Sequence, residues 1–387
     1  MNADDLIARA AQRCGCPDSG GTYRVGLDKF LEDFALSPTV TEFGRQAAEG
    51  WVLDALAARF SIDGWIAAHP EVLDRPVQRP VFITGLPRAG TTLLLNLLAL
   101  DPQHRVYGIW ESNREVPPVE AAHLRDDPRI AQKVAEVNAA LASGFLDHRY
   151  HVELGDEPGE CVWLLGQDFK SYPWLILTAV PRYFDWLFHE ANLLDAYRHH
   201  RRALQVMQSR APGQWILKFP MHAAFLDELL SVYPDARIVL THRDPVVPLG
   251  SSCSASFHLT KQFNAGLSPA YTGQETLSIV AASLRGACSL RQRHPETPVL
   301  DFHYSRFVED PIAEICGLYR FMGEEIAPEI ELRMRQALDK QRALRKQVGK
   351  HEYSLEEFGL SRARLPPIFD EYVEQFGIAR EAPRGRA

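Results

Sequence analysis

The chain has 387 residues, 46% of them hydrophobic, which is enough to bury one large core or two modest ones. Its formal net charge of −8 argues against a nucleic-acid-binding protein, because such proteins present a basic surface. The six cysteines include no CxxC pair and have no histidines at zinc-site spacing, so no structural zinc site is expected.

The N-terminal residues lack the features of a secreted protein. They are charged and contain no apolar stretch of the kind found in signal peptides. No apolar run in the chain reaches the roughly eighteen residues that a membrane span needs. The sequence therefore predicts a cytoplasmic protein with no membrane span and no nucleic-acid partner. It does not indicate an oligomeric state.

Residues 1–75 are predicted to form a helical N-terminal extension. Apolar residues recur there at intervals of three and four, as over 27–34, which is typical of amphipathic helices. A pair of prolines ends this pattern, so we place a domain boundary near residue 76. We expect an α/β domain over 76–378 and a flexible polar tail over 379–387.

The α/β domain is predicted from strands that alternate with helices. Short apolar runs predict strands at 81–85, 214–219, 236–242 and 299–302. Helical patterns cover 91–100, 128–147, 195–208, 222–233 and 311–346. A strand, a helix and a second strand in succession form a βαβ unit. The sequence thus predicts the α/β class, with a P-loop-type parallel sheet wrapped by helices.

The first strand leads into Gly-Leu-Pro-Arg-Ala-Gly-Thr-Thr, which has the glycine spacing of a phosphate-binding loop. Backbone N–H groups of such a loop and of the following helix converge on one anion, and glycines let the backbone approach its oxygens. An ATP-binding loop carries a lysine where this chain has Thr91, and the cation here is Arg88. This difference argues against an ATP-dependent enzyme. The predicted cofactor-binding residues of the loop are Gly85, Leu86, Pro87, Arg88, Ala89, Gly90, Thr91 and Thr92.

Two further cations stand where later strands end. Lys218 closes one apolar strand, and Arg243 follows another, with Ser251 eight residues further on. Open α/β sheets bind ligands at the carboxyl ends of their strands, so we interpret these residues as anion-binding. The competing interpretations are a surface Arg243 paired with Asp244 and a lysine whose ammonium group reaches solvent.

Together, GLPRAGTTLL, LKFPMHA and YPDARIVLTHRDP resemble the motifs of sulfotransferases that use 3′-phosphoadenosine 5′-phosphosulfate (PAPS). The closer likeness is to a large bacterial branch with a P-R-x-G-T-T loop, which tyrosylprotein and carbohydrate sulfotransferases share. The resemblance extends from about residue 80 to 378 and includes DEPGEC at 156–161, HYSRFVEDP at 303–311 and KHEYSLEEFGL at 350–360.

The resemblance implies in-line transfer of a sulfuryl group from PAPS to a hydroxyl, or in second place an amine, of a small-molecule or lipid-like acceptor. The nucleotide product would be 3′,5′-adenosine bisphosphate (PAP), and no metal is implied. The loop at 85–92 would hold the 5′-phosphosulfate, with Arg88 on the bridging oxygen. Lys218 would stabilise the sulfuryl group in transit. Ala89 replaces the serine more usual in this loop, which removes one hydroxyl donor.

The same resemblance assigns the other end of the donor. Arg243 and Ser251 would bind the 3′-phosphate, which distinguishes PAPS from ATP. Tyr304 would lie near the nucleotide. Lys350 and His351 fall in a loop that would close over the donor.

The reaction needs a general base to accept the proton of the acceptor hydroxyl. In P-R-x-G-T-T relatives this base is a glutamate just past the loop helix, and Glu111 is the matching residue. Two different interpretations are that Glu111 is a solvated loop carboxylate, or that His148 or His151 is the base, since the cytosolic branch uses a histidine.

Two segments of the chain and the function itself allow more than one interpretation from sequence. The aromatic block at 163–188 is interpreted as core or as an acceptor pocket, and the basic residues at 198–202 as a solvated helix face or an anion-binding surface. The competing functions are an ATP-dependent kinase with an altered loop and a nucleotide-binding protein without catalysis.

Overall fold

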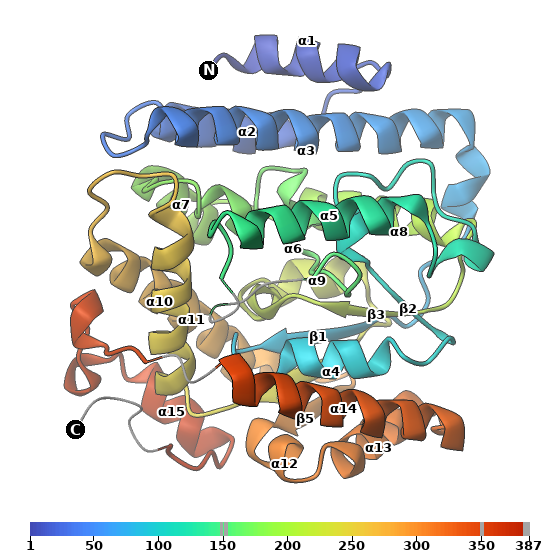
Figure 1. Ribbon diagram of the computed structural model, residues 1–387, viewed down its shortest axis with the longest axis vertical. Helices are drawn as coiled ribbons and strands as arrows, with labels where there is room; N and C mark the ends of the chain where they lie inside the picture. The colour runs from blue at the N-terminus through green and yellow to red at the C-terminus, as the bar shows by residue number, and fades with distance from the viewer. Residues whose placement is uncertain (148–149, 151–153, 349–351, 382–387) are drawn as a thin grey trace.

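A parallel β-sheet forms the centre of the molecule, with helices on both faces (Figure 1). The computed structural model describes residues 1–147, 150, 154–348 and 352–381. Within these residues five parallel strands pair in the order β2-β3-β1-β4-β5. Their bounds are Val81–Gly85 for β1, His104–Val106 for β2, Gln214–Lys218 for β3, Arg237–His242 for β4 and Val299–His303 for β5. The predicted α/β class is confirmed.

The predicted strands coincide with β1, β3, β4 and β5 to within one residue at each end. The sequence does not predict β2, because it has three residues and begins with the polar pair His104 and Arg105. The helix expected at 222–233 is a 3₁₀ turn, η5 (Pro220–Ala224), followed by α9 (Leu226–Val232). Since β1 lies between β3 and β4, this connection crosses β1 instead of joining neighbouring strands.

The helices nearest the sheet are α4 (Thr91–Leu98), α8 (Leu194–Gln208), α11 (Pro269–Arg293), α12 (Tyr304–Glu309), α13 (Pro311–Met322) and α14 (Pro328–Val348). α4, α12, α13 and α14 cover one face, where they share a buried cluster with Val81 and Ile83 of β1. α8, α9 and α11 cover the other face, where Phe82 belongs to a second buried cluster. Because both faces are covered, every residue of β1 is buried.

Residues 1–75 form a helical layer at one end of the molecule (top of Figure 1). Its elements are α1 (Ala3–Cys14), α2 (Tyr23–Phe34), α3 (Glu42–Ala68) and the 3₁₀ turn η1 (Pro70–Asp74). Gly26 of α2 packs so tightly that an added Cβ would lie 2.5 Å from the Phe169 carbonyl oxygen. Arg59 of α3 forms a buried ion pair with Asp168, at 3.0 Å. The layer therefore shares one core with the rest of the chain, while the boundary near residue 76 stays a prediction.

The remaining elements are α5 (Pro128–Ala142), α6 (Val162–Gly166), α7 (Pro181–His189), α10 (Val246–Thr260), α15 (Ile368–Gln375) and the 3₁₀ turns η2 (Ile109–Glu111), η3 (Ala121–His123), η4 (Tyr172–Trp174), η6 (Glu356–Phe358) and η7 (Arg362–Arg364). The helix predicted at 128–147 ends earlier, as α5. The one predicted at 311–346 is two helices, because Gly323 adopts a φ of +77° and ends α13.

The basic helix predicted at 195–208 is α8, and it is solvated on one side. Arg198 and Arg201 are exposed, whereas His199 and His200 are buried. Burial lowers the pKa of His200 to about 3, so this histidine is neutral inside the fold. The interpretation as a solvated face is therefore wrong for the two histidines.

The aromatic block at 163–188 contributes mainly to the core. Phe169, Trp174 and Tyr183 are at most 2% exposed. Trp163 differs, because it is half-buried and contacts Trp51 of α3, with 5.9 Å between ring centroids.

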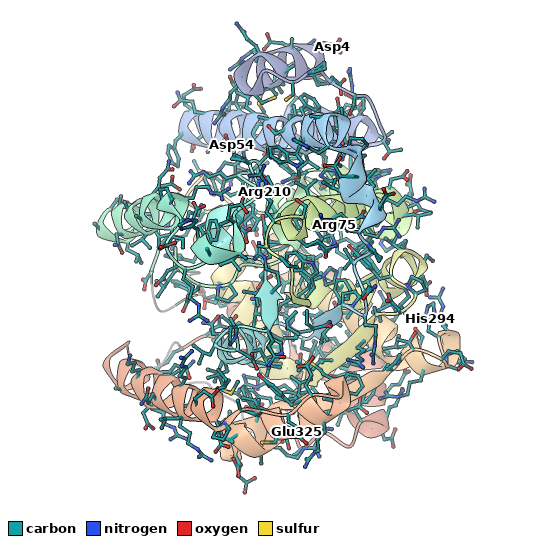
Figure 2. The ribbon with its side chains drawn as sticks, turned by 90° about the vertical axis from the view of Figure 1, so that its right-hand side faces the viewer. Asp4, Asp54, Arg75, Arg210, His294 and Glu325 are labelled. Atoms are coloured by element: carbon teal, nitrogen blue, oxygen red, sulfur yellow. The ribbon has the colours of Figure 1, made fainter. Side chains whose placement is uncertain are left out.

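Charged side chains lie at both ends of the molecule. Figure 2 shows Asp4 and Asp54 on the N-terminal helices and Glu325 near the opposite end. Across the described ranges, no helix combines the length and the apolar character that crossing a membrane requires.

Candidate active site

All five strands end at the same edge of the sheet, called here the carboxyl edge, and several predicted site residues gather there. β1 runs into the loop at 85–92, and β3 ends at Lys218. β4 is followed directly by Arg243, and β5 by Tyr304. Parallel pairing fixes this arrangement, because neighbouring strands that run in one direction bring their ends side by side.

The loop at 85–92 has backbone conformations that favour glycine. Gly85 and Gly90 have φ values of +122° and +85°. An added Cβ on Gly85 would lie 2.5 Å from the Thr241 carbonyl oxygen, and one on Gly90 would lie 3.1 Å from the Tyr304 ring. Arg88 also has a positive φ, +60°. Such a conformation costs a non-glycine residue about 1–3 kcal/mol, and residues of this kind cluster at ligand-binding sites.

α4 begins directly after this loop, and no side chain caps its N-terminus. The first backbone N–H groups of a helix have no partner within the helix, and the helix dipole favours an anion beside them. Leu86 and Ala89 anchor the loop in the core, because both side chains are fully buried. The helix is anchored in the core by Leu94, Leu95, Leu97 and Leu98. Core packing therefore fixes the helix end that faces the predicted phosphate site.

Arg88, Arg243 and Ser251 converge although they are far apart in sequence. The Arg88 Nε donates to Ser251 Oγ at 3.1 Å. The Arg243 Nη1 donates to the Arg88 carbonyl oxygen at 2.7 Å. The Arg243 guanidinium also lies over the Tyr304 ring, 4.1 Å from its centroid, an arrangement that holds the cation in place. With a side chain that is 6% exposed, Arg243 is not a surface residue, so that competing interpretation is wrong.

The Arg243 guanidinium binds a carboxylate from the C-terminal segment. Its Nε and Nη2 donate to the two oxygens of Glu381, at 2.6 and 2.8 Å. The Glu381 backbone N–H donates to Asp244 Oδ2 at 2.8 Å. The polar composition of the tail predicts a frayed end, but these contacts hold residue 381 at the carboxyl edge. The residues after it lie outside the described part of the chain.

Lys218 lies at the same edge with its ammonium group turned inwards. Its side chain is 0% exposed, which excludes the interpretation as a lysine that reaches solvent. The Nζ donates to Thr92 Oγ1 at 3.3 Å, and so lies beside the first turn of α4. It also donates to Glu160 Oε1 at 2.5 Å. Sequence reasoning missed Glu160, although the residue belongs to the DEPGEC motif.

Glu111 is buried beside β2, and both of its carboxylate oxygens accept hydrogen bonds. Both of its oxygens accept from the Arg105 guanidinium, at 2.5 and 3.0 Å, and one also accepts from the Gly108 backbone N–H. The two side chains of this pair are 3% and 2% exposed, so Glu111 is not a solvated loop carboxylate. The pair closes the turn after β2. Its catalytic role stays a prediction.

Near Glu111, Glu115 is a second buried carboxylate. One of its oxygens accepts from the Tyr107 hydroxyl, the Gln167 amide and the Asn113 backbone N–H. Its other oxygen has no hydrogen-bond partner. Burial raises the pKa of Glu115 to about 7, so the carboxyl group titrates near neutrality.

We expect the Glu115→Gln variant to gain stability relative to wild type as pH rises. The pKa of Glu115 is about 7 in the folded state, against about 4.5 for an ordinary glutamate. A group with a raised folded-state pKa favours folding below its unfolded pKa, and that contribution is lost as pH rises through the folded value. Between pH 5 and pH 8 the difference should change by about 2–3 kcal/mol. Urea unfolding at both pH values measures it, and an unchanged difference contradicts the assignment.

Four predicted residues lie outside the described residues: His148, His151, Lys350 and His351. The segment that follows Lys350 and His351 is described and packs against α10 beside Ser251. The Tyr353 hydroxyl donates to the Val247 carbonyl oxygen at 3.0 Å. An added Cβ on Gly250 would lie 2.5 Å from the Tyr353 ring.

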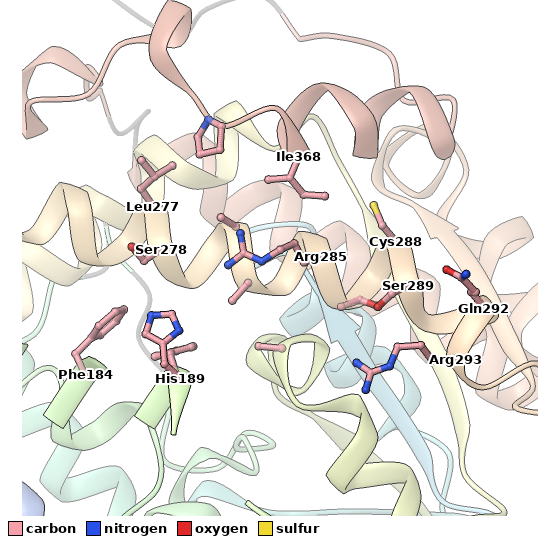
Figure 3. Close-up of a pocket in the computed structure, with 16 residues that line it drawn as sticks. Phe184, His189, Leu277, Ser278, Arg285, Cys288, Ser289, Gln292, Arg293 and Ile368 are labelled. Atoms are coloured by element: carbon pink, nitrogen blue, oxygen red, sulfur yellow. The ribbon is translucent and has the colours of Figure 1, made fainter. Parts of the chain in front are cut away.

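A separate cavity of about 780 Å³ opens beside α11, and it is lined by other residues than those at the carboxyl edge (Figure 3). Phe184, Arg285 and Ile368 line it, and none of its lining residues belongs to the loop at 85–92 or to the contacts of Lys218 and Arg243. We therefore do not assign the reaction to it. Among the described residues, no group of three or more histidines, cysteines or acidic residues is arranged to hold a metal ion.

Comparison with known proteins identifies the class of this site. The model of the sulfotransferase family matches residues 80–328, and the chain belongs to that family. The predicted resemblance is thereby confirmed at the level of the family and of sulfotransferase activity.

Two solved structures are similar along nearly the whole chain. Sulfotransferase STF9 from Mycobacterium avium is 34% identical with a TM-score of 0.90, and the match covers 100% of this chain and 98% of STF9. Sulfotransferase STF1 from Mycobacterium tuberculosis H37Rv is 28% identical with a TM-score of 0.82, over 97% and 98% of the two chains. The omega-hydroxy-beta-dihydromenaquinone-9 sulfotransferase Stf3 from Mycobacterium bovis is 25% identical over 320 residues, which are 79% of this chain and 76% of Stf3.

Proposed function

We propose that this sulfotransferase uses PAPS and transfers its sulfuryl group to a hydroxyl of an apolar, lipid-like acceptor. The observation that carries the proposal is the grouping of the loop at 85–92 with Lys218, Arg243 and Ser251 at one sheet edge. PAPS, when bound, supplies a sulfuryl group joined to the 5′-phosphate through a bond that is readily broken.

The 3′-phosphate would bind where Glu381 now lies. The Glu381 carboxylate accepts two hydrogen bonds from the fork of Arg243, and a guanidinium in this arrangement can hold an anion with two oxygens. A phosphate matches the same donors. Ser251 would add a hydroxyl to this site, and Arg88 links the two residues, because its Nε donates to Ser251 and its carbonyl oxygen accepts from Arg243.

The 5′-phosphosulfate would bind the loop at 85–92. Backbone N–H groups of the loop and of α4 supply donors, and Arg88 and Lys218 supply positive charge on either side. Charge that develops in the transition state is stabilised by donors already held in position. Both cations are held in this way, Arg88 by Ser251 and Lys218 by Thr92 and Glu160.

The acceptor class rests on a cluster of aromatic rings that includes Trp163. The rings pair with centroid distances of 5.6–6.2 Å. They are Phe43 and Trp51 of α3, Phe145, Trp163 of α6 and Phe263. The Trp163 N–H donates to the carbonyl oxygen of Glu160 at 3.5 Å, and the Glu160 carboxylate accepts from Lys218, so Trp163 links this cluster to the carboxyl edge. Together with the hydroxylated quinone derivative in the name of Stf3, it supports an apolar alcohol as acceptor.

The direct test supplies PAPS labelled with radioactive sulfur to long-chain primary alcohols and to ω-hydroxylated quinols. The proposal predicts a labelled sulfate ester formed in equal amount with PAP. Transfer of the γ-phosphate from Mg-ATP instead of sulfur from PAPS contradicts it.

The Glu381→Gln variant is expected to bind PAP more tightly than wild type. The nucleotide must displace a carboxylate from Arg243, and a neutral amide competes less well for the guanidinium, by about three- to tenfold. Calorimetric titration with PAP measures the change. Glu374→Gln, an exposed residue of the preceding helix, is the matched control. Unchanged PAP affinity in Glu381→Gln contradicts the assignment of the 3′-phosphate to Arg243.

A further inference from the structure

We infer that the cavity beside α11 binds an amphiphilic anion, a molecule with one sulfate or carboxylate group and an apolar chain. The cavity measures about 780 Å³. Sites for small molecules commonly measure about 300–1,000 Å³, so the space is large enough for such a ligand. The residues that line it include none from the loop at 85–92, and neither Lys218 nor Arg243. The cavity is therefore a second site, separate from the carboxyl edge.

One wall of the cavity is a face of α11 with mostly small side chains. Ser278, Ala282, Arg285 and Ser289 line the cavity and follow one another at intervals of four, three and four residues, so they share one face of the helix. Three of these four side chains are small and leave space beside the helix. An added Cβ on Gly286 would collide with the carbonyl oxygen of Ala223, so α11 packs closely against η5. The sequence of α11 and this packing together produce the cavity.

The other walls are mainly apolar. Phe184 and Phe188 of α7 line the cavity, with 4.7 Å between their ring centroids. Ile368, the first residue of α15, lies across the cavity from Phe184 (Figure 3). The Gln375 amide at the end of α15 donates to the Cys288 carbonyl oxygen at 3.0 Å, which joins α15 to α11. Walls of this composition favour an apolar chain over water.

Arg285 gives the cavity a positive charge. Within the described residues its guanidinium forms no hydrogen bond or ion pair, whereas Arg293, which also lines the cavity, is paired with Asp227. No aspartate or glutamate is among the described residues that line the cavity, although the chain has 50 of them. Figure 3 shows Arg285 between Leu277 and Ser289. An arginine in this position binds an anion with its planar fork of N–H donors.

The two features together define the class of ligand. The guanidinium of Arg285 matches two oxygens of a sulfate or a carboxylate, and the rings of α7 accept an apolar chain. This chemistry has two sources. A long-chain sulfate ester is the kind of product that transfer to an apolar alcohol releases, and a long-chain carboxylate is a fatty acid. Only the first source rests on the proposed function.

The test is calorimetric titration with decyl sulfate and decanoate, which have chains of ten carbons and one charge each. Decanol and inorganic sulfate serve as ligands that lack the charge or the chain. The proteins are wild type, Arg285→Ala, Ser278→Trp, which fills the cavity from an exposed position, and the control Arg320→Ala, an exposed arginine of α13 that does not line the cavity. PAP binding, measured on each variant, reports whether the carboxyl edge is intact.

We expect wild type to bind one decyl sulfate or one decanoate per chain in this cavity, at least about tenfold more tightly than decanol or inorganic sulfate. Arg285→Ala should weaken binding of both anions at least about tenfold, and Ser278→Trp should weaken it similarly. Arg320→Ala should match wild type. Tighter binding of decyl sulfate identifies the sulfate ester as the ligand, and tighter binding of decanoate identifies the fatty acid.

Three results would overturn the inference. The first is a wild-type protein that binds neither anion. The second is binding that is unchanged in both Arg285→Ala and Ser278→Trp, because the ligand then lies elsewhere, for example at the acceptor site. The third is decanol binding as tight as that of the two anions, because the positive charge then has no role. Each of these results leaves PAP binding, and with it the proposed function, as a separate question.

Discussion

Replacing Lys218 with methionine is expected to lower kcat at least about a hundredfold while the fold and the affinity for PAP are kept. The ammonium group lies beside Thr92 and Glu160, where it is held before any ligand arrives. A cation positioned in advance stabilises charge that develops in the transition state more than charge already present in the product nucleotide. The effect should therefore fall on kcat more than on PAP binding.

Methionine is chosen because the Lys218 side chain is 0% exposed, and an apolar chain of similar length fills the same space. Glu160, left without the lysine, is partly exposed and can be hydrated. Lys218→Arg, which keeps the charge, should recover part of the activity. A kcat within about tenfold of wild type in Lys218→Met contradicts the role of this residue.

Replacing Arg243 with alanine is expected to weaken PAP binding by about 10- to 150-fold, which corresponds to the 1.5–3 kcal/mol of hydrogen bonds to a charged group. The affinity for 5′-AMP, which has no 3′-phosphate, should change by less than about threefold. Calorimetric titration with the two nucleotides measures the selectivity that Arg243 confers.

Arg243 also donates to the Arg88 carbonyl oxygen, so 5′-AMP binding serves as the control for the integrity of the loop. Glu381→Gln removes the competing carboxylate, so comparing the PAP affinity of Glu381→Gln with that of the double variant Arg243→Ala and Glu381→Gln isolates the contact between Arg243 and the phosphate. Equal losses for PAP and 5′-AMP contradict the assignment of Arg243 to the 3′-phosphate.

The sequence predicts those parts of the site that depend on local pattern. A buried strand shows as a short apolar run, and the residue that follows it lies at the carboxyl edge whatever the rest of the fold. Lys218 and Arg243 are found this way, as is the loop between Gly85 and Gly90. β2 is missed because three residues with two polar side chains carry no such pattern.

Contacts between segments that are distant in the chain could not be predicted from the sequence. Glu160 reaches Lys218 because its segment binds the chain after β2 and the end of β3, and neither contact has a local signature. Glu381 meets Arg243 across 138 positions. The capping bond between Glu111 and the Gly108 N–H is local, but the ion pair with Arg105 depends on how the chain turns after β2.

The most direct measurement of the central claim is the thermal stability of the purified protein with PAP, compared with ATP, ADP and 5′-AMP, each with and without Mg²⁺. A ligand that binds the folded state at a hundredfold excess over Kd adds about 2.7 kcal/mol, which is readily visible in the melting temperature. The account predicts stabilisation by PAP that needs no metal and exceeds that of the three nucleotides without a 3′-phosphate. Stabilisation by Mg-ATP with none by PAP would contradict it.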